Sequence, residues 1–148
     1  MRQGNLRVMR LALPALAVLL LAACASQPPA NPFAGDWTTA ERQRIAFRDN
    51  TVVIQPPDAA PTPMAADSCD GVFRFGYASR SRDALLGLTP RQPDLKKRLS
   101  TMLVKADYPV AELNCGEGAS TYVLLDDRDL VVIHRDRDIG GIETLTRL

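Results

Sequence analysis

Three cysteines and one histidine are the residues of this chain best suited to covalent or metal chemistry. A thiol beside an imidazole could act as a nucleophile, and both side chains are common zinc ligands. Cys69, Cys115 and His134 are far apart in the sequence, and no local motif joins them. In the apolar run 131–134, alternation places His134 on the same strand face as Val132. We therefore interpret His134 as a structural residue and expect no metal site and no catalytic residue.

Three carboxylates between 126 and 129 are a second candidate site. Asp126, Asp127 and Asp129 supply the oxygen atoms that Ca²⁺ prefers. A calcium loop of the EF-hand type also needs a central glycine and a distal glutamate, and this segment has neither. An Asp-rich hairpin turn explains the segment better. The sequence also lacks G-x-S-x-G, a phosphate-binding loop and H-E-x-x-H, so it favours a non-enzymatic protein without a cofactor.

The first 23 residues are typical of a secretory signal peptide. Arg2, Arg7 and Arg10 form a positive region, and residues 11–21 form an apolar stretch too short to span a bilayer as a stable helix. The stretch ends at Leu21-Ala22-Ala23-Cys24, where small residues precede a cysteine. This order predicts cleavage before Cys24.

The Leu-Ala-Ala-Cys segment resembles the lipobox of bacterial lipoproteins. This resemblance implies a diacylglycerol on Cys24, cleavage before it and acylation of the new amino group. Each buried CH₂ contributes about 0.8 kcal/mol, so several chains would hold the protein on a membrane. The residue after Cys24 is Ala25 rather than Asp, and by resemblance this implies the periplasmic face of the outer membrane. Membrane lipid, reached through acylated Cys24, is thus one expected partner.

Composition divides the rest of the chain into a tether and one domain. Residues 24–34 are small, polar and rich in proline, which indicates a lipidated flexible tether. Residues 35–148 are expected to form a single periplasmic domain with one core. The envelope is oxidising, so we expect Cys69 and Cys115, the cysteines left after Cys24, to form a disulfide.

Alternating apolar residues and turn signals predict mainly β structure. Residues 43–55 are predicted to form a hairpin with a turn at Asp49-Asn50, and four prolines make 56–67 a surface loop. Residues 79–88 are ambiguous, with one helical turn around Ala84. The remaining predicted strands are 71–78, 110–115, 120–125, 130–135 and 142–148, and 93–106 is the predicted helix. We therefore expect a mainly β (α+β) fold, either a small antiparallel barrel or a curved meander sheet with one packed helix.

The charge of the chain bears on one class of partner, nucleic acid. The precursor has 18 basic and 17 acidic residues, and three of the basic ones lie in the signal peptide. The remaining 15 against 17 give a net charge of −2, with both signs mixed along the chain. Because no basic stripe could neutralise phosphates, nucleic acid is not an expected partner.

Gly35-Asp36-Trp37, at the start of the domain, resembles the opening of lipocalins and of small-barrel protease inhibitors of the bacterial periplasm. In lipocalins a late arginine packs across this tryptophan, and the resemblance implies that role for Arg147, with Trp37 as a buried structural anchor. The expected function is a membrane-anchored envelope lipoprotein that acts as a non-enzymatic binding or structural module. A partner protein in the envelope is left open. The alternative is a periplasmic protease inhibitor of the small-barrel type.

Overall fold

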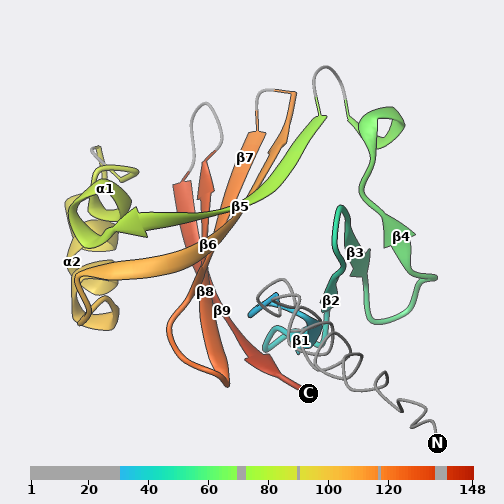
Figure 1. Ribbon diagram of the computed structural model, residues 1–148, viewed down its shortest axis with the longest axis horizontal. Coiled ribbons are helices and arrows are strands. Elements are labelled where there is room, and N and C mark those ends of the chain that lie inside the picture. Colours follow the sequence, from blue (N-terminus) through green and yellow to red (C-terminus); the bar gives the residue numbers. More distant parts are fainter. Residues whose placement is uncertain (1–30, 70–72, 90, 117, 136–139) are drawn as a thin grey trace, which may run out of the picture. The chain divides into compact units, whose positions relative to one another are not determined.

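A computed structural model describes residues 31–69, 73–89, 91–116, 118–135 and 140–148. Within these residues the chain is mainly β, with two short α-helices and one 3₁₀ turn (Figure 1). The elements are β1 Gly35–Thr38, β2 Arg44–Phe47, β3 Val52–Gln55, β4 Thr62–Pro63, η1 Ala66–Ser68, β5 Phe73–Ser81, α1 Arg82–Leu86, α2 Pro93–Met102, β6 Asp107–Cys115, β7 Gly118–Leu124, β8 Asp129–Arg135 and β9 Gly140–Arg147.

All nine strands belong to one antiparallel sheet that curls into a half-barrel. Their order is β4-β3-β2-β1-β9-β8-β7-β6-β5, so consecutive strands are neighbours except for β4 and β5, and the last strand, β9, pairs with the first, β1. The two outer strands, β4 and β5, are not paired with each other in this order. Of the two architectures that the sequence left open, the fold is therefore the curved sheet and not the closed barrel.

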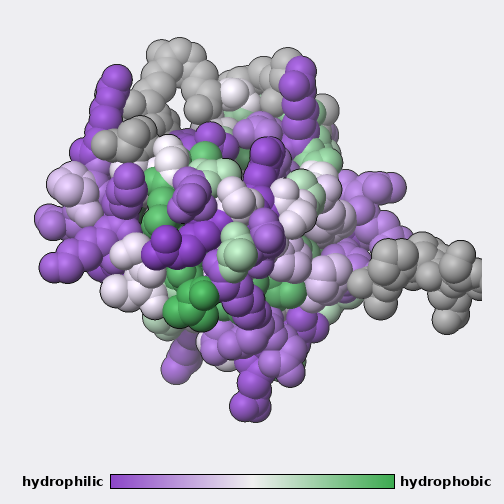
Figure 2. Space-filling view, turned by 60° about the vertical axis from the view of Figure 1, so that its left-hand side comes forward, coloured by the Kyte–Doolittle hydropathy of each residue, from purple (hydrophilic) through white to green (hydrophobic). Residues whose placement is uncertain are grey.

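Each face of the curled sheet carries a separate apolar core. Alternation along the strands sends successive side chains to opposite faces, so the central strands are buried on both sides. The concave core consists of Phe33, Trp37, Ile45, Phe47, Val52, Ala111, Leu113, Tyr122, Leu124, Leu130, Val132 and Leu145. The convex core, which includes the apolar sides of α1 and α2, consists of Leu85, Leu86, Leu99, Leu103, Tyr108, Val110, Val123, Val131 and Ile133. With the helix-bearing side turned forward, the surface is mostly hydrophilic (Figure 2).

The predicted hairpin at 43–55 is confirmed, and the proline-rich loop needs a correction. The chain reverses at Asp49-Asn50, where the Arg48 N–H donates to the Thr51 carbonyl at 2.9 Å. We expected no strand in 56–67, yet Thr62 and Pro63 form the two-residue strand β4. Strand β4 lies at the sheet edge and pairs only with β3, and a proline is tolerated in such a position because no second neighbour needs its missing N–H.

The helical region differs from the prediction in two ways. Helix α2 ends at Met102 rather than at 106, because Leu103 is extended (φ −87°, ψ 91°) and fully buried in the convex core. Arg82 then caps the helix, donating from Nε to the Leu103 carbonyl at 2.7 Å. The ambiguous segment 79–88 forms the end of β5 and a second helix, α1, whose N-cap Ser81 accepts a hydrogen bond from the Ala84 N–H. The single predicted helix is therefore one of two.

The folded unit begins at Asn31, so the last residues assigned to the tether belong to the domain. Phe33 is 1% exposed and packs in the concave core, with its ring centroid 5.3 Å from that of Phe47. The proline-rich composition of residues 24–34 indicated a tether. Burial of one large apolar side chain, that of Phe33, is enough to hold the end of this segment on the core. The predicted signal peptide, Cys24 and the predicted tether up to residue 30 lie outside the described residues.

Candidate functional site

Trp37 and Arg147 lie directly opposite each other where β1 pairs with β9. The indole is fully buried, and its Nε1 donates to the Phe33 carbonyl at 3.0 Å. The Arg147 guanidinium lies over the ring, with Cζ 4.4 Å from the centroid. Nη1 and Nη2 of Arg147 also donate to the carbonyls of Ala34 (2.7 Å) and Pro32 (2.8 Å). The pair thus fastens the beginning of the domain to its last strand.

This arrangement also bears on the alternative function. A protease inhibitor that used the N-terminal segment as its reactive strand would need that segment accessible to a protease. At 32–34, two carbonyls are bonded to Arg147 and the Phe33 side chain is buried. In the structure, residues 32–34 pack against the rest of the domain.

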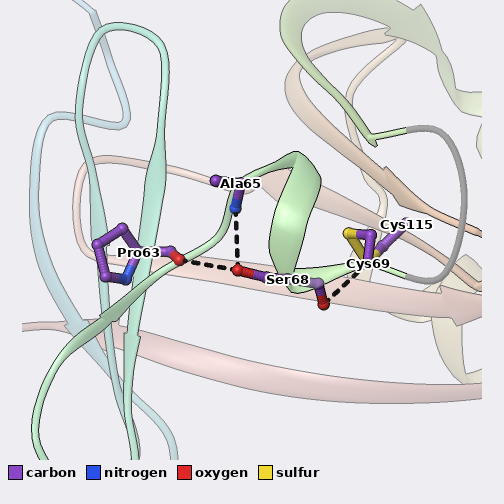
Figure 3. The surroundings of a disulfide bond; sticks show 5 residues. All are labelled: Pro63, Ala65, Ser68, Cys69 and Cys115. Carbon is purple, nitrogen blue, oxygen red and sulfur yellow. Dashed lines mark hydrogen bonds between the residues drawn. A yellow bond between two sulfur atoms is a disulfide. The ribbon is translucent and has the colours of Figure 1, made fainter.

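Cys69 and Cys115 form a disulfide, with a Cα–Cα distance of 5.1 Å (Figure 3). Cys69 follows η1, and Cys115 ends β6, so the bond joins the chain beyond edge strand β4 to the strand beside the other edge. Ser68 orders the approach to Cys69: its hydroxyl donates to the Pro63 carbonyl at 3.3 Å and accepts from the Ala65 N–H at 3.4 Å. The disulfide therefore holds the two sides of the half-barrel together.

Aromatic side chains bridge the same opening. Tyr77, on edge strand β5, stacks on Phe33 with ring centroids 5.6 Å apart, and its hydroxyl donates to the Arg48 carbonyl at the end of β2 (2.8 Å). Partial burial raises the pKa of the Tyr77 phenol. Phe75, also on β5, stacks on Phe47 of β2 at 6.5 Å. The half-barrel is thus closed by side chains where no backbone pairing closes it.

Beside the disulfide, the concave side of the sheet is hollowed into an open groove of about 320 Å³, which we call the inner groove. One wall comes from β3 and the chain after β4, and the other from β6, β7 and β8. Its lining is mostly apolar and carries polar groups at the β8 side. The lining residues are Ile54, Met64, Leu113, Cys115, Gly118, Ala119, Ser120, His134 and Arg135.

Ser120 and His134 line this end of the groove, and Glu143, beside His134, extends them into a polar row on the neighbouring strands β7, β8 and β9. Ser120 and His134 are register partners, and Ser120 Oγ lies 3.0 Å from His134 Nδ1. On the other side of the ring, Nε2 lies 3.7 Å from Glu143 Oε2. The histidine side chain is 44% exposed and the glutamate 33%, so the row borders solvent and the groove together.

Sequence reasoning missed two members of this row. His134 was interpreted as a structural strand residue, and its neighbour in the groove, Cys115, is held in the disulfide and has no free thiol. Ser120 and Glu143 were not singled out. The predicted turn at 126–129 could not have located the row, because a hairpin centred there would place residue 120 opposite 135, one residue away from the observed pairing with 134.

The Asp-rich segment forms a turn, as expected. Asp126 Oδ1 accepts hydrogen bonds from the backbone N–H groups of Arg128 and Asp129, both at 2.8 Å. These two bonds lower the pKa of the Asp126 carboxyl. In the part of the chain that the structure describes, no group of three or more His, Cys, Asp or Glu side chains is arranged to hold a metal ion.

Comparison with known proteins gives no match, either to a family model or to a curated protein or a solved structure. Across the described residues, no helix has the length and apolar character needed to cross a membrane.

Proposed function

We propose that the protein is a lipid-anchored lipoprotein of the outer membrane whose curled β domain binds a small, largely apolar ligand in the inner groove. The lipobox-like segment ending at Cys24 supports the anchor and the periplasmic address. The observation that carries the binding role is the groove itself, an open hollow on the concave face of a disulfide-linked sheet.

The size and lining of the groove support a small-molecule ligand. A volume of about 320 Å³ lies at the lower end of the range for ligand pockets, roughly 300–1,000 Å³. Ile54, Met64 and Leu113 supply apolar surface from both walls, and Ser120 and His134 supply polar groups at one end. A few polar groups in an apolar lining fix the orientation of a ligand and favour an amphipathic molecule with a short apolar chain.

A glycine in the groove offers a direct test. A side chain at Gly118 would begin in ordinary contact, with its Cβ 3.6 Å from the Cys115 carbonyl, so Gly118→Phe should fill the groove without backbone strain. Gly76→Phe is the matched control, because a Cβ at Gly76 on edge strand β5 meets nothing within 4 Å. We expect the neutral dye Nile red to bind the wild type and the control, and to bind the Gly118 variant at least about tenfold more weakly. Equal binding by all three would refute the groove as the site.

The anchor is tested separately. Mass spectrometry of the mature N-terminus should show an acylated cysteine at position 24, and Cys24→Ser should abolish both the modification and retention in the outer-membrane fraction. An unmodified N-terminus at another residue would refute the anchoring proposal and would leave the groove experiment unaffected.

A further inference from the structure

We propose that the inner groove also hydrolyses carboxylic esters, with Ser120 as nucleophile, His134 as general base and Glu143 as the residue that positions the imidazole. The inference rests on the proposed function in using the same groove for the acyl chain, and it goes beyond that function in adding a chemical step. The absence of a recognisable nucleophile–base pair in the sequence argued against an enzyme. The structure brings such a pair together at 3.0 Å.

The order of the three side chains determines which nitrogen can act as a base. The Glu143 carboxylate, 3.7 Å from Nε2, favours the imidazole tautomer that carries its proton on Nε2. The lone pair of Nδ1 then faces Ser120 Oγ and accepts the hydroxyl proton. Distances between catalytic side chains, such as the 3.7 Å between His134 Nε2 and Glu143 Oε2, are often longer in a ligand-free site and shorten when the substrate binds.

The strand register places the nucleophile beside the apolar wall. Ser120 of β7 is paired with His134 on one side and with Leu113 of β6 on the other. All three residues line the groove, so an acyl chain lying against Leu113 would bring its carbonyl carbon towards Ser120. The substrate class that fits is a neutral ester with a short apolar acyl group.

The chemical step balances with water as the only co-reactant. Ser120 Oγ attacks the carbonyl carbon while its proton passes to His134 Nδ1. The carbon–oxygen bond to the alcohol then breaks, and the alcohol leaves with that proton. A water molecule, deprotonated by His134, attacks the acyl-serine, and the acid departs as the proton returns to Ser120. The Glu143 carboxylate stabilises the imidazolium formed in each half of the cycle.

Two variants and one control test the nucleophile and the base. Hydrolysis of p-nitrophenyl butyrate should be lost in Ser120→Ala and should fall by about 10²-fold or more in His134→Asn, in line with the usual contribution of a general base. A fluorophosphonate should label the wild type at Ser120 and at no other serine. The control is Ser79→Ala, because Ser79 is exposed on β5 away from the groove, and it should keep full activity and labelling. Circular dichroism of each variant checks that it folds.

Glu143 needs a readout that a purely structural role would not change. His134 is the only histidine, so ¹⁵N NMR of a histidine-labelled sample reports on this ring alone. At alkaline pH the wild type should show the proton on Nε2. Glu143→Gln should shift the population towards a mixture of tautomers and reduce the rate while leaving Nile red binding unchanged.

The outcomes separate this inference from the proposed binding function. If Nile red binds the wild type but the ester is not cleaved and Ser120 is not labelled, the hydrolytic inference is wrong and the binding function stands. If hydrolysis survives in Ser120→Ala, the row is not the active site. If neither the dye nor the ester is bound, both proposals fail.

Discussion

Replacing Arg147 with alanine tests how the beginning of the domain is held. The guanidinium makes three contacts that alanine cannot make: it covers the Trp37 ring, and it donates to the carbonyls of Pro32 and Ala34. The rest of β9 should be unaffected, since the Arg147 N–H still donates to the Arg128 carbonyl at 2.8 Å. The expected effect is therefore a loosening of residues 32–34.

The magnitude follows from these contacts. A partly desolvated cation over a tryptophan contributes about 1–2 kcal/mol. Each hydrogen bond to a carbonyl adds about 1 kcal/mol, near the neutral value because both bonds are accessible to solvent. The buried Nε of Arg147 has no hydrogen-bond partner, and this offsets part of the gain. We expect Arg147→Ala to lower the free energy of unfolding by about 2 kcal/mol, and Arg147→Lys by about half as much, because lysine keeps the charge but cannot bridge two carbonyls.

Urea unfolding followed by tryptophan fluorescence measures this effect directly, because Trp37 is the only tryptophan. In the folded wild type the buried ring should emit in the blue and resist quenching by acrylamide. In Arg147→Ala the folded state should emit further to the red and be quenched more easily, since the guanidinium that covers the ring is gone. Trp37→Ala, followed by circular dichroism, should cost about 3–5 kcal/mol.

Two results would refute this reasoning. Red emission and easy quenching in the folded wild type would mean that Trp37 is not buried. An unfolding free energy unchanged in both Arg147 variants would mean that the cation and its two hydrogen bonds contribute nothing net, so that the contacts of Phe33 with Trp37 and Tyr77 hold the segment.

Two further predictions concern the disulfide and a buried phenol. Reducing the Cys69–Cys115 bond, which spans 46 residues of sequence, should lower the free energy of unfolding by roughly 4 kcal/mol on the chain-entropy model; two freely alkylated cysteines in protein isolated without a reductant would contradict the bond. Burial, together with the charge of Glu143, raises the pKa of Tyr122 to about 12 from 10.0. The contribution of Tyr122 to stability should therefore be constant below pH 10 and fall between pH 10 and about 12, where Tyr122 ionises only in the unfolded chain. Tyr122→Phe should remove most of that fall, and urea unfolding at a series of pH values would show it.

The local parts of the fold could be predicted because their signals lie within a few residues of each other. The turn at Asp49-Asn50 and the Asp-rich turn at 126–129 both follow from residue types that tolerate tight turns. The early end of α2 could not be predicted, because Leu103 leaves the helix in order to fill the convex core. Likewise, Phe33 is buried through its contact with strands that come later in the chain.

The candidate site also has one part that could be predicted from the sequence and one part that could not. Counting cysteines was enough to pair Cys69 with Cys115, since only two remain after position 24. The Ser120–His134–Glu143 row needs the register of two successive hairpins, and a shift of one residue in either would turn a member of the row to the opposite face. Alternation alone allows either register, so the row is visible only once the pairing is known.

The groove also depends on distant contacts, because its two walls belong to opposite ends of an open sheet. Ile54 and Met64 come from the β3–β4 side, and Leu113 and Ser120 from the β6–β7 side. An open sheet has no backbone pairing to fix the distance between such walls, so that distance is set here by the disulfide and the aromatic contacts across the opening. Reduction of the disulfide should therefore weaken ligand binding in the groove even where the rest of the sheet stays folded. This links the stability of the domain to its proposed function through a single bond.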